Sequence, residues 1–125
     1  MIIDVVAAMI CDDNKFMICQ RPETKARPLC WEFPGGKVDS NETKERALIR
    51  ECNEELGIIL KVHENIADTI YEYDEVSIHL YLFTASISEG VPQLREHNDL
   101  RWITKDEISE YIFCPADRVI LKKLL

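Results

Sequence analysis

Apolar runs separated by turn residues predict several short strands in the first third of the chain. Residues 5–10 form an almost continuous apolar run, and the apolar segment 16–20 follows it after Asp, Asp and Asn. This pattern predicts two strands joined as a β-hairpin. The segment 21–29 contains two prolines and no apolar period, which indicates a loop. Residues 30–33 then predict a short strand that the following Pro-Gly-Gly ends.

One helix is predicted near the middle of the chain, over residues 42–56. Its apolar positions recur at a spacing of four and are Leu48, Cys52 and Leu56, with Ala47 beside them. Ser40 and Asn41 are the candidate N-cap residues, and Gly57 follows the last apolar position as a stop. Periodicity with signals at both ends predicts a helix that buries one face.

The second half of the chain predicts further strands and two more helices. The predicted strands are 58–62, 66–73, 76–86 and 100–103. A capping box from Thr104 to Glu107 opens a short helix, and Pro115 begins a terminal one. The residues expected to face inward on the terminal helix are Val119, Ile120 and Leu124. Strands around one central helix, with a helix at the end, predict an α/β sandwich in one domain.

The composition is typical of a soluble globular protein and argues against several partners. Of 125 residues, 46% are hydrophobic and 30% charged, and 15 Lys and Arg against 23 Asp and Glu give a net charge of −8. Tight binding to a nucleic-acid polymer or an anionic membrane needs clustered basic residues. The longest uncharged apolar run, Val5–Cys11, is too short to span a bilayer. We therefore expect a cytoplasmic protein whose five cysteines, with no C-x-x-C pair, are buried reduced thiols.

Charge changes sign at position 50. Segment 21–50 has 7 basic and 5 acidic residues, a net charge of +2, whereas segment 51–75 has 1 basic and 8 acidic residues, a net charge of −7. The acidic segment opens with Glu51, Glu54 and Glu55, whose spacing places three carboxylates on one helix face. Such a group is either a solvated acidic face or part of a site for a hard divalent cation.

The glycine pair before the helix favours the cation site. Gly35 and Gly36 let the backbone approach a ligand closely, and a loop carbonyl adds one more oxygen to the three carboxylates. Mg²⁺ suits such an open set of oxygen ligands, because it keeps several waters and binds substrate phosphates directly.

The spacing of these residues resembles the signature of the Nudix hydrolase family, G-x5-E-x7-R-E-U-x-E-E-x-G-U, where U is aliphatic. The matching residues are Gly36, Glu42, Arg50, Glu51, Glu54, Glu55, Gly57 and Ile58. Cys52 stands where the family usually has an aliphatic residue. Because cysteine is a small apolar side chain, we expect altered packing and retained activity.

Further segments are similar to the MutT-like branch of the family, which hydrolyses nucleoside triphosphates. They are Gln20-Arg21-Pro22, Trp31–Lys37 and Pro115-Ala116-Asp117. The pair Glu96-His97 before a strand with Trp102 is similar to the bacterial CTP pyrophosphohydrolase type. The resemblance implies the Nudix fold, an α/β/α sandwich with a central mixed β-sheet, as a single Nudix hydrolase domain over residues 1–125.

For the metal, the resemblance implies Mg²⁺, with Mn²⁺ as the alternative ion. The implied ligands are the carbonyl of Gly35 and the carboxylates of Glu51, Glu54, Glu55 and Glu96. The same four glutamates are the implied catalytic residues. Either Glu51 or Glu96 is implied to deprotonate the attacking water, and the sequence leaves that choice open. The residues implied to support the box structurally are Gly36, Glu42, Arg50 and Gly57.

For the substrate, the resemblance implies that Arg21 and Lys37 contact phosphate oxygens. Phe33 and Tyr73 line a nucleobase pocket or, equally, pack in the core. Asp117 matches a position that reads the base, where the family usually has Asn; a first-turn helix carboxylate is the alternative interpretation. Arg27 has no such match and is interpreted as solvated surface. The histidines interpreted as structural are His63, His79 and His97.

The implied reaction converts a nucleoside triphosphate and water to the monophosphate and pyrophosphate. The MutT-like segments favour CTP or dCTP analogues, and 8-oxo-dGTP stays open as a substrate in nucleotide-pool sanitation. A dinucleoside polyphosphate hydrolase is an alternative, because that group carries a tyrosine near the position of Tyr73. A non-catalytic Nudix-fold binding domain is another, although such domains commonly lose box carboxylates that this chain keeps. The sequence leaves the choice between monomer and homodimer open.

Overall fold

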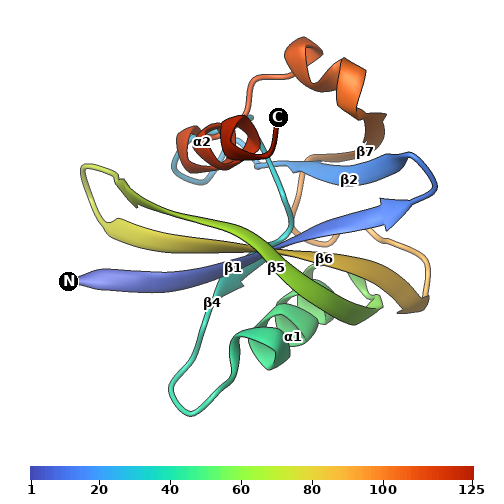
Figure 1. Ribbon diagram of the computed structural model, residues 1–125, viewed down its shortest axis with the longest axis horizontal. Helices are drawn as coiled ribbons and strands as arrows, with labels where there is room; N and C mark the ends of the chain where they lie inside the picture. Colours follow the sequence, from blue (N-terminus) through green and yellow to red (C-terminus); the bar gives the residue numbers. More distant parts are fainter.

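Strand β1 (Ile2–Asp12) organises the fold, because it takes part in both halves of a seven-stranded mixed sheet (Figure 1). The computed structural model describes residues 1–125. Most of β1 pairs in parallel with β6 (Ser77–Glu89), and its middle pairs antiparallel with β4 (Gly35–Lys37). Its end turns back into β2 (Lys15–Gln20), which confirms the predicted hairpin.

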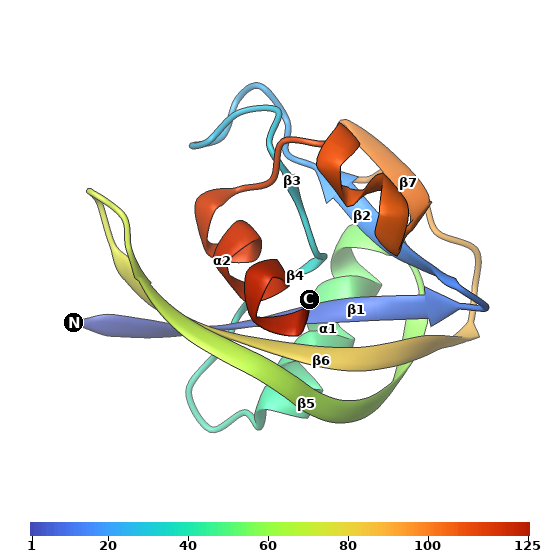
Figure 2. The same ribbon diagram turned by 45° about the horizontal axis from the view of Figure 1, so that its top comes forward.

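The other strands extend the sheet on both sides of β1. The main path runs β3-β2-β1-β6-β5, where β3 is Trp31–Glu32 and β5 is Ile59–Glu72. Strand β7 (Asp99–Thr104) pairs antiparallel with β2 along its whole length. As a result, the β2–β3 loop and the β5–β6 hairpin lie at the same end of the molecule (Figure 2).

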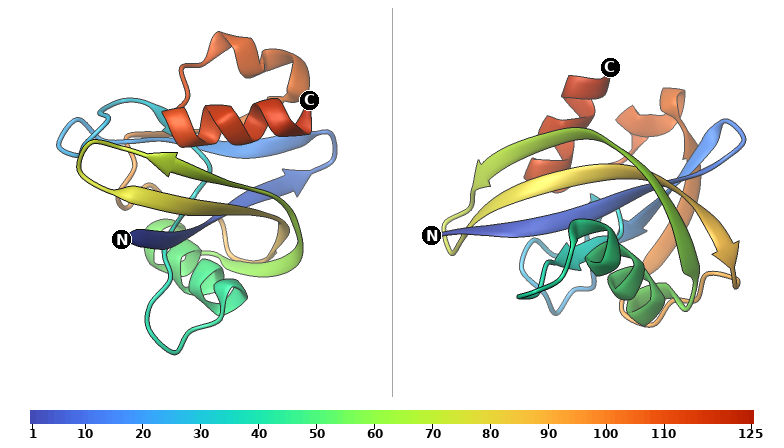
Figure 3. Two further views of the ribbon diagram at one scale, coloured as in Figure 1. Left: turned by 60° about the vertical axis from the view of Figure 1, so that its left-hand side comes forward. Right: turned by 60° about the horizontal axis from the view of Figure 1, so that its bottom comes forward.

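Two helices cover opposite faces of the sheet (Figure 3). Helix α1 (Lys44–Leu56) packs on one core cluster and helix α2 (Pro115–Leu124) on the other. Side chains alternate along β1, so Val6 and Ala8 join the α1 core while Ala7 joins the α2 core. This arrangement confirms the predicted α/β/α sandwich.

Helix α1 buries the predicted apolar face, and its boundary differs by two residues. The buried residues of the helix are Ala47, Leu48, Cys52, Glu55 and Leu56. Gly57 ends it in the left-handed conformation, with φ of 69°, as expected for a C′ residue. The predicted caps Ser40 and Asn41 are wrong, because Thr43 is the N-cap and its Oγ1 accepts the Arg46 N–H at 3.1 Å.

Other predicted boundaries are also corrected. The predicted strands 58–62 and 66–73 are one strand, β5, interrupted by register shifts between Val62 and Ala67. Residues 35–37, expected to stop a strand, form β4 on the edge of β1. The capping box at Thr104 opens a 3₁₀ helix, η1 (Lys105–Glu110), in which Glu107 Oε1 accepts the Thr104 N–H at 2.8 Å.

The inward face of the terminal helix is partly mispredicted. Ile120 is buried as expected, whereas Val119 is half-buried and Leu121 takes the second large core position. The buried set of α2 also includes Ala116 and Asp117, near its start. Asp117 is a buried polar residue at the start of α2, and its carboxylate accepts the N–H of Phe33.

The cysteines follow the prediction in three of five cases. Cys19, Cys52 and Cys114 are buried, whereas Cys11 is exposed and Cys30 is half-buried, and all five are free thiols. Neither helix α1 nor α2 is long and apolar enough to cross a membrane.

Candidate active site

One cavity of about 490 Å³ gathers most of the predicted site residues. It lies between the β2–β3 loop, β4, α1 and the start of α2. The predicted residues that line it are Arg21, Phe33, Gly35, Gly36, Lys37, Glu51, Glu55, Tyr73, Glu96 and Asp117. Glu54, Glu42, Arg50 and Gly57 stand outside its lining. We call the part next to α1 the metal end (Gly35, Glu51, Glu55, Glu96) and the part next to α2 the base end (Glu32, Phe33, Tyr73, Asp117).

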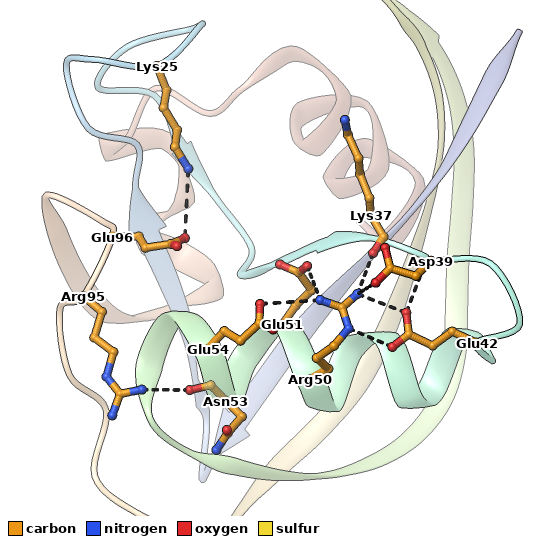
Figure 4. Close-up of polar contacts among 10 residues, drawn as sticks. All are labelled: Lys25, Lys37, Asp39, Glu42, Arg50, Glu51, Asn53, Glu54, Arg95 and Glu96. Carbon is orange, nitrogen blue, oxygen red and sulfur yellow. Dashed lines mark hydrogen bonds and ion pairs between the residues drawn. The ribbon is translucent and has the colours of Figure 1, made fainter.

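Arg50 connects Glu51 of the metal end to acidic residues beside it (Figure 4). Its Nε donates to Glu42 Oε2 at 2.7 Å, and its Nη1 donates to Glu51 Oε1 at 2.7 Å. Its Nη2 also donates to the carbonyl oxygen of Lys37, at the end of β4. The hydrogen bond from Arg50 lowers the pKa of Glu42 to about 2. Arg50 therefore joins the β4–α1 connection to Glu51, and more loosely to Glu54, through one guanidinium.

Glu55 has the opposite environment, because it is buried and forms no ion pair. The residue is 7% exposed, and its Oε1 has no hydrogen-bond partner. Burial, and then the nearby carboxylates of Glu51 and Glu32, raise the pKa of Glu55 to about 9. A buried carboxylate oxygen without a partner is costly. This oxygen is therefore suited to a positively charged ligand.

The three glutamates Glu51, Glu54 and Glu55 differ in burial, which their spacing in the sequence did not indicate. Glu54 is largely exposed, with 59% of its side chain accessible, and lies 3.5 Å from Arg50. Glu51 is partly buried, which raises its pKa, and Arg50 opposes that rise. A Cβ added at Gly36 would collide with Glu51 Oε2, and one at Gly35 would collide with the carbonyl oxygen of Val6. Gly36 therefore lets the β4 backbone lie close to Glu51, and Gly35 lets it lie close to β1.

Glu96 reaches the metal end from a loop that is attached to helix α1 (Figure 4). Its neighbour Arg95 donates to the carbonyl oxygen of Asn53 at 3.2 Å, near the C-terminus of α1, where a cation is favourable. Gly57 leaves room for this contact, because a Cβ there would lie 2.8 Å from Arg95 Nη2. The Glu96 carboxylate lies 4.0 Å from Lys25 Nζ and is half-exposed. Arg95 thus sets the position of the loop that carries Glu96.

The base end contains a compact polar cluster. Ligand atoms of Glu32, Cys114 and Asp117 lie within 4.8 Å of one another. Asp117 Oδ1 accepts the Phe33 N–H at 3.0 Å, and Glu32 Oε1 accepts from Arg21 Nη1 at 3.0 Å. Burial, and then Glu32, raise the pKa of Asp117 well above its usual range. Since Arg21 already supplies a cation here, we interpret the cluster as a hydrogen-bonding surface.

Tyr73 is held at the mouth of the base end. Its hydroxyl accepts the Ala116 N–H at 2.9 Å, and burial raises its pKa to about 12. The guanidinium carbon of Arg27 lies 3.8 Å from the centre of its ring, and Arg27 Nη1 donates to Glu75 Oε2 at 2.8 Å. The interpretation of Arg27 as solvated surface is therefore wrong.

His63 and His79 have structural contacts, in agreement with their interpretation, whereas His97 also lines the cavity. His97 is buried, and its Nε2 lies 3.2 Å from Glu32 Oε2. His79 Nε2 lies 2.6 Å from Asp68 Oδ2 on the neighbouring strand, and His63 contacts Ser86.

Sequence reasoning missed several residues of this cavity. They are Lys25, Arg27, Glu32, His97 and Cys114, which all line it. Glu32 lies inside the Trp-Glu-Phe-Pro segment that resembles the MutT-like branch, so that segment held a signal for it. His97 belongs to the Glu96-His97 pair, and Cys114 directly precedes the Pro115-Ala116-Asp117 segment, so both also lay beside a marked motif. Lys25 and Arg27 pair with residues far along the chain, and nothing in their local sequence marks them.

The donor set at the metal end fits a hard divalent cation. It consists of carboxylates on α1, the carboxylate of Glu96 and the backbone at Gly35, and Mg²⁺ prefers oxygen ligands of this kind. The unpartnered Oε1 of Glu55 is the observation that supports this fit. Arg50 Nη1 lies 2.7 Å from Glu51 Oε1 and 3.5 Å from Glu54 Oε2, so this cation balances the charge of two of the carboxylates.

Comparisons with known proteins assign the chain to a family. Residues 1–124 match the family model described as NUDIX domain. The chain is 38% identical to the CTP pyrophosphohydrolase of Escherichia coli (strain K12), covering 98% of this chain and 91% of that protein. It is 33% identical to the 8-oxo-dGTP diphosphatase of Haemophilus influenzae, covering 99% and 92%. The crystal structure of a MutT NUDIX hydrolase from Burkholderia pseudomallei matches with a TM-score of 0.89 at 26% identity, covering 100% of this chain and 99% of that chain. The chain belongs to the Nudix family of hydrolases.

Proposed function

We propose that this Nudix hydrolase is a nucleoside triphosphate pyrophosphohydrolase that depends on Mg²⁺, with Mn²⁺ as the alternative ion. The products are a nucleoside monophosphate and pyrophosphate, and residues 1–125 act as one catalytic domain. The observation that carries the proposal is the buried, unpartnered Oε1 of Glu55, in the same cavity as the polar cluster around Asp117. Such a cavity suits a nucleotide, whose phosphates are charged and whose base is planar and polar. Nudix hydrolases generally use divalent metals.

At the metal end, we assign the ion to oxygen ligands on three segments. The proposed ligands are the Gly35 carbonyl and the carboxylates of Glu51, Glu54, Glu55 and Glu96. When bound, the ion would neutralise phosphate charge and lower the pKa of a nearby water. Glu51 or Glu96 accepts the proton of the attacking water, and Arg50 holds Glu51 in place through the 2.7 Å hydrogen bond. Glu42 and Gly57 support this arrangement by binding Arg50 and by giving room to Arg95.

The phosphate chain needs cations beyond the metal, because a triphosphate carries several negative charges. Lys37 is exposed on the wall of the cavity, next to the metal end, and we assign it to phosphate oxygens. Arg21 is engaged with Glu32 and with the carbonyl oxygen of Ala26, which draws it toward the base end. We assign Arg21 to the substrate from that side.

Base recognition is assigned to Asp117, with Phe33 and Tyr73 as neighbouring walls. The raised pKa of Asp117 favours a carboxyl group that keeps its proton near neutral pH, so it can donate as well as accept a hydrogen bond. CTP, dCTP and 8-oxo-dGTP are the proposed substrates, supported by relatives named CTP pyrophosphohydrolase and 8-oxo-dGTP diphosphatase. Replacing Asp117 with Asn should change the order of preference among these nucleotides and leave the metal requirement unchanged; an unchanged order would remove Asp117 from base recognition.

A panel of nucleoside triphosphates, dinucleoside polyphosphates and ADP-ribose with Mg²⁺ tests the reaction through release of pyrophosphate. We expect release from at least one nucleoside triphosphate, and none in EDTA. Glu51→Gln should lower kcat by several hundred-fold or more without unfolding the protein. Glu45→Gln is the matched control, because Glu45 is an exposed first-turn glutamate of the same helix. Near-wild-type turnover by Glu51→Gln would refute the role of Glu51.

A further inference from the structure

Arg27 connects two segments on opposite sides of the base end. It lies in the β2–β3 loop, and its partners Tyr73 and Glu75 lie at the β5–β6 hairpin, which Figures 2 and 3 show beside that loop. The ion pair with Glu75 measures 2.8 Å, and the guanidinium lies 3.8 Å from the ring centre of Tyr73. Both Arg27 and Tyr73 line the cavity. Arg27 is thus part of the cavity wall.

The β2–β3 loop holds Arg27 in an uncommon backbone conformation. Its φ is 53°, in the left-handed region that residues other than glycine rarely adopt. Hydrogen bonds across the loop maintain it, because the Arg21 N–H donates to the Cys30 carbonyl at 2.9 Å and Arg21 Nε donates to the Ala26 carbonyl at 2.7 Å. Strained residues persist where surrounding contacts over-determine them, and they gather at functional sites.

The partner ring is equally well fixed. The hydroxyl of Tyr73 binds the Ala116 N–H, at the start of α2, and its ring centre lies 4.7 Å from that of Tyr71. Only 25% of the charged Arg27 side chain is exposed, so most of it is covered by these contacts. A guanidinium is planar and stacks on aromatic faces. Arg27 and Tyr73 therefore present a rigid, layered surface to the cavity.

We propose that Arg27, held by Glu75 against the ring of Tyr73, is a substrate-binding residue that forms the stacking surface for the nucleobase. This rests on the proposed nucleotide substrate and adds a specific wall to its base pocket. Bases bind by stacking on aromatic rings and on arginine guanidinium planes, while hydrogen bonds read their edges. The cluster of Asp117 and Glu32 supplies such an edge-reading surface in the same cavity.

The proposal separates affinity for the base from affinity for the phosphates. The side-chain partners of Arg27 are Glu75 and Tyr73, and neither belongs to the metal end. Loss of Arg27 should therefore weaken binding of the nucleoside part and leave the phosphate chain and metal unaffected. One stacked base typically contributes about 10-fold or more in affinity.

The test compares Arg27→Ala, Arg27→Lys and Glu75→Gln with the wild type. Equilibrium binding of α,β-methylene-CTP is measured by calorimetry with Mg²⁺, next to binding of inorganic tripolyphosphate, which has no base. We expect Arg27→Ala to weaken the nucleotide analogue about 10-fold and to leave tripolyphosphate within about twofold. Arg27→Lys keeps the charge without the plane and should lose almost as much. Glu75→Gln keeps the guanidinium and should lose about two- to threefold, as expected for a partly exposed ion pair.

Several results would overturn the proposal. One is that Arg27→Ala weakens the affinity for α,β-methylene-CTP and for tripolyphosphate equally, and another is that it weakens neither. A third is that Arg27→Lys binds the analogue as tightly as the wild type, which would mean that Arg27 contributes only its charge. Failure of the wild type to bind the analogue would overturn it too. Binding is measured without turnover, so a wild type that binds the analogue but releases no pyrophosphate refutes the proposed function alone. Thermal melting of each variant verifies that it is folded.

Discussion

Replacing Glu55 with glutamine should make the metal-free protein more stable relative to the wild type as the pH rises, while weakening its affinity for the metal. Burial and neighbouring carboxylates raise the pKa of Glu55 from 4.5 to about 9 in the folded protein. The folded state therefore holds a proton that the unfolded state releases between these two values. The associated stability is fully present below pH 4.5 and is lost as the pH rises toward 9.

The magnitude follows from this difference in proton binding. One proton costs about 1.4 kcal/mol per pH unit, so the wild type at pH 7 has lost about 3 kcal/mol relative to pH 4.5. A glutamine cannot ionise and avoids this loss, although its buried amide needs new hydrogen-bond partners, at about 1–3 kcal/mol. That second cost does not depend on pH. The difference in unfolding free energy between Glu55→Gln and wild type should therefore rise by about 1.4 kcal/mol per pH unit from pH 5.5 to 8.5.

Urea denaturation in EDTA at pH 5.5, 7.0 and 8.5 measures this slope. Other titrating groups are common to both proteins, so their contributions cancel in the difference. In EDTA, Glu54→Gln is the control on the same helix, and its pH dependence should follow the wild type because Glu54 is largely exposed. Excess Mg²⁺ should stabilise the wild type and have little effect on Glu55→Gln. A difference between Glu55→Gln and wild type that stays constant over this pH range would refute the reasoning.

Three further substitutions test single contacts by urea denaturation. Gly57→Ala should cost about 1–2 kcal/mol, because alanine is strained at a φ of 69° and its Cβ pushes Arg95 away; a cost that does not fall in an Arg95→Ala background would refute that contact. Arg50→Gln should cost about 1–3 kcal/mol, since two partly buried glutamates lose their cation, and an unchanged midpoint would contradict this. Tyr73→Phe should cost about 1–2 kcal/mol, because the Ala116 N–H loses its acceptor; restored stability on Tyr73→Trp would point to packing instead.

The elements that depend on local periodicity could be predicted from the sequence. The apolar face of α1 at Leu48, Cys52 and Leu56 is buried as expected, because a spacing of four residues leaves one choice of face. The start of α1 could not be predicted to the residue. Ser40, Asn41 and Thr43 all precede the helix and all have side chains that can cap it, so the local sequence does not single out Thr43.

The site was predictable where its residues are close in sequence and not where they meet across the fold. Spacing placed Glu51 and Glu55 on one face, yet it carried no information on how the helix is rolled against the sheet. That roll makes Glu55 a buried residue. The ion pair of Arg27 with Glu75 joins positions 48 residues apart, so no local pattern indicates it. Its neighbourhood of prolines and polar residues predicted only a loop.

The two faces of the sheet give this enzyme two cores that can change separately. Glu51 and Glu55 stand on a helix whose buried side chains, such as Cys52, belong to the first core. Phe33 belongs to the second, and Asp117 on α2 accepts the Phe33 N–H beside it. Substitutions that reshape the second core can alter which base is accepted without disturbing the carboxylates on the first. A lineage of such proteins can therefore diversify in substrate while keeping one hydrolytic centre.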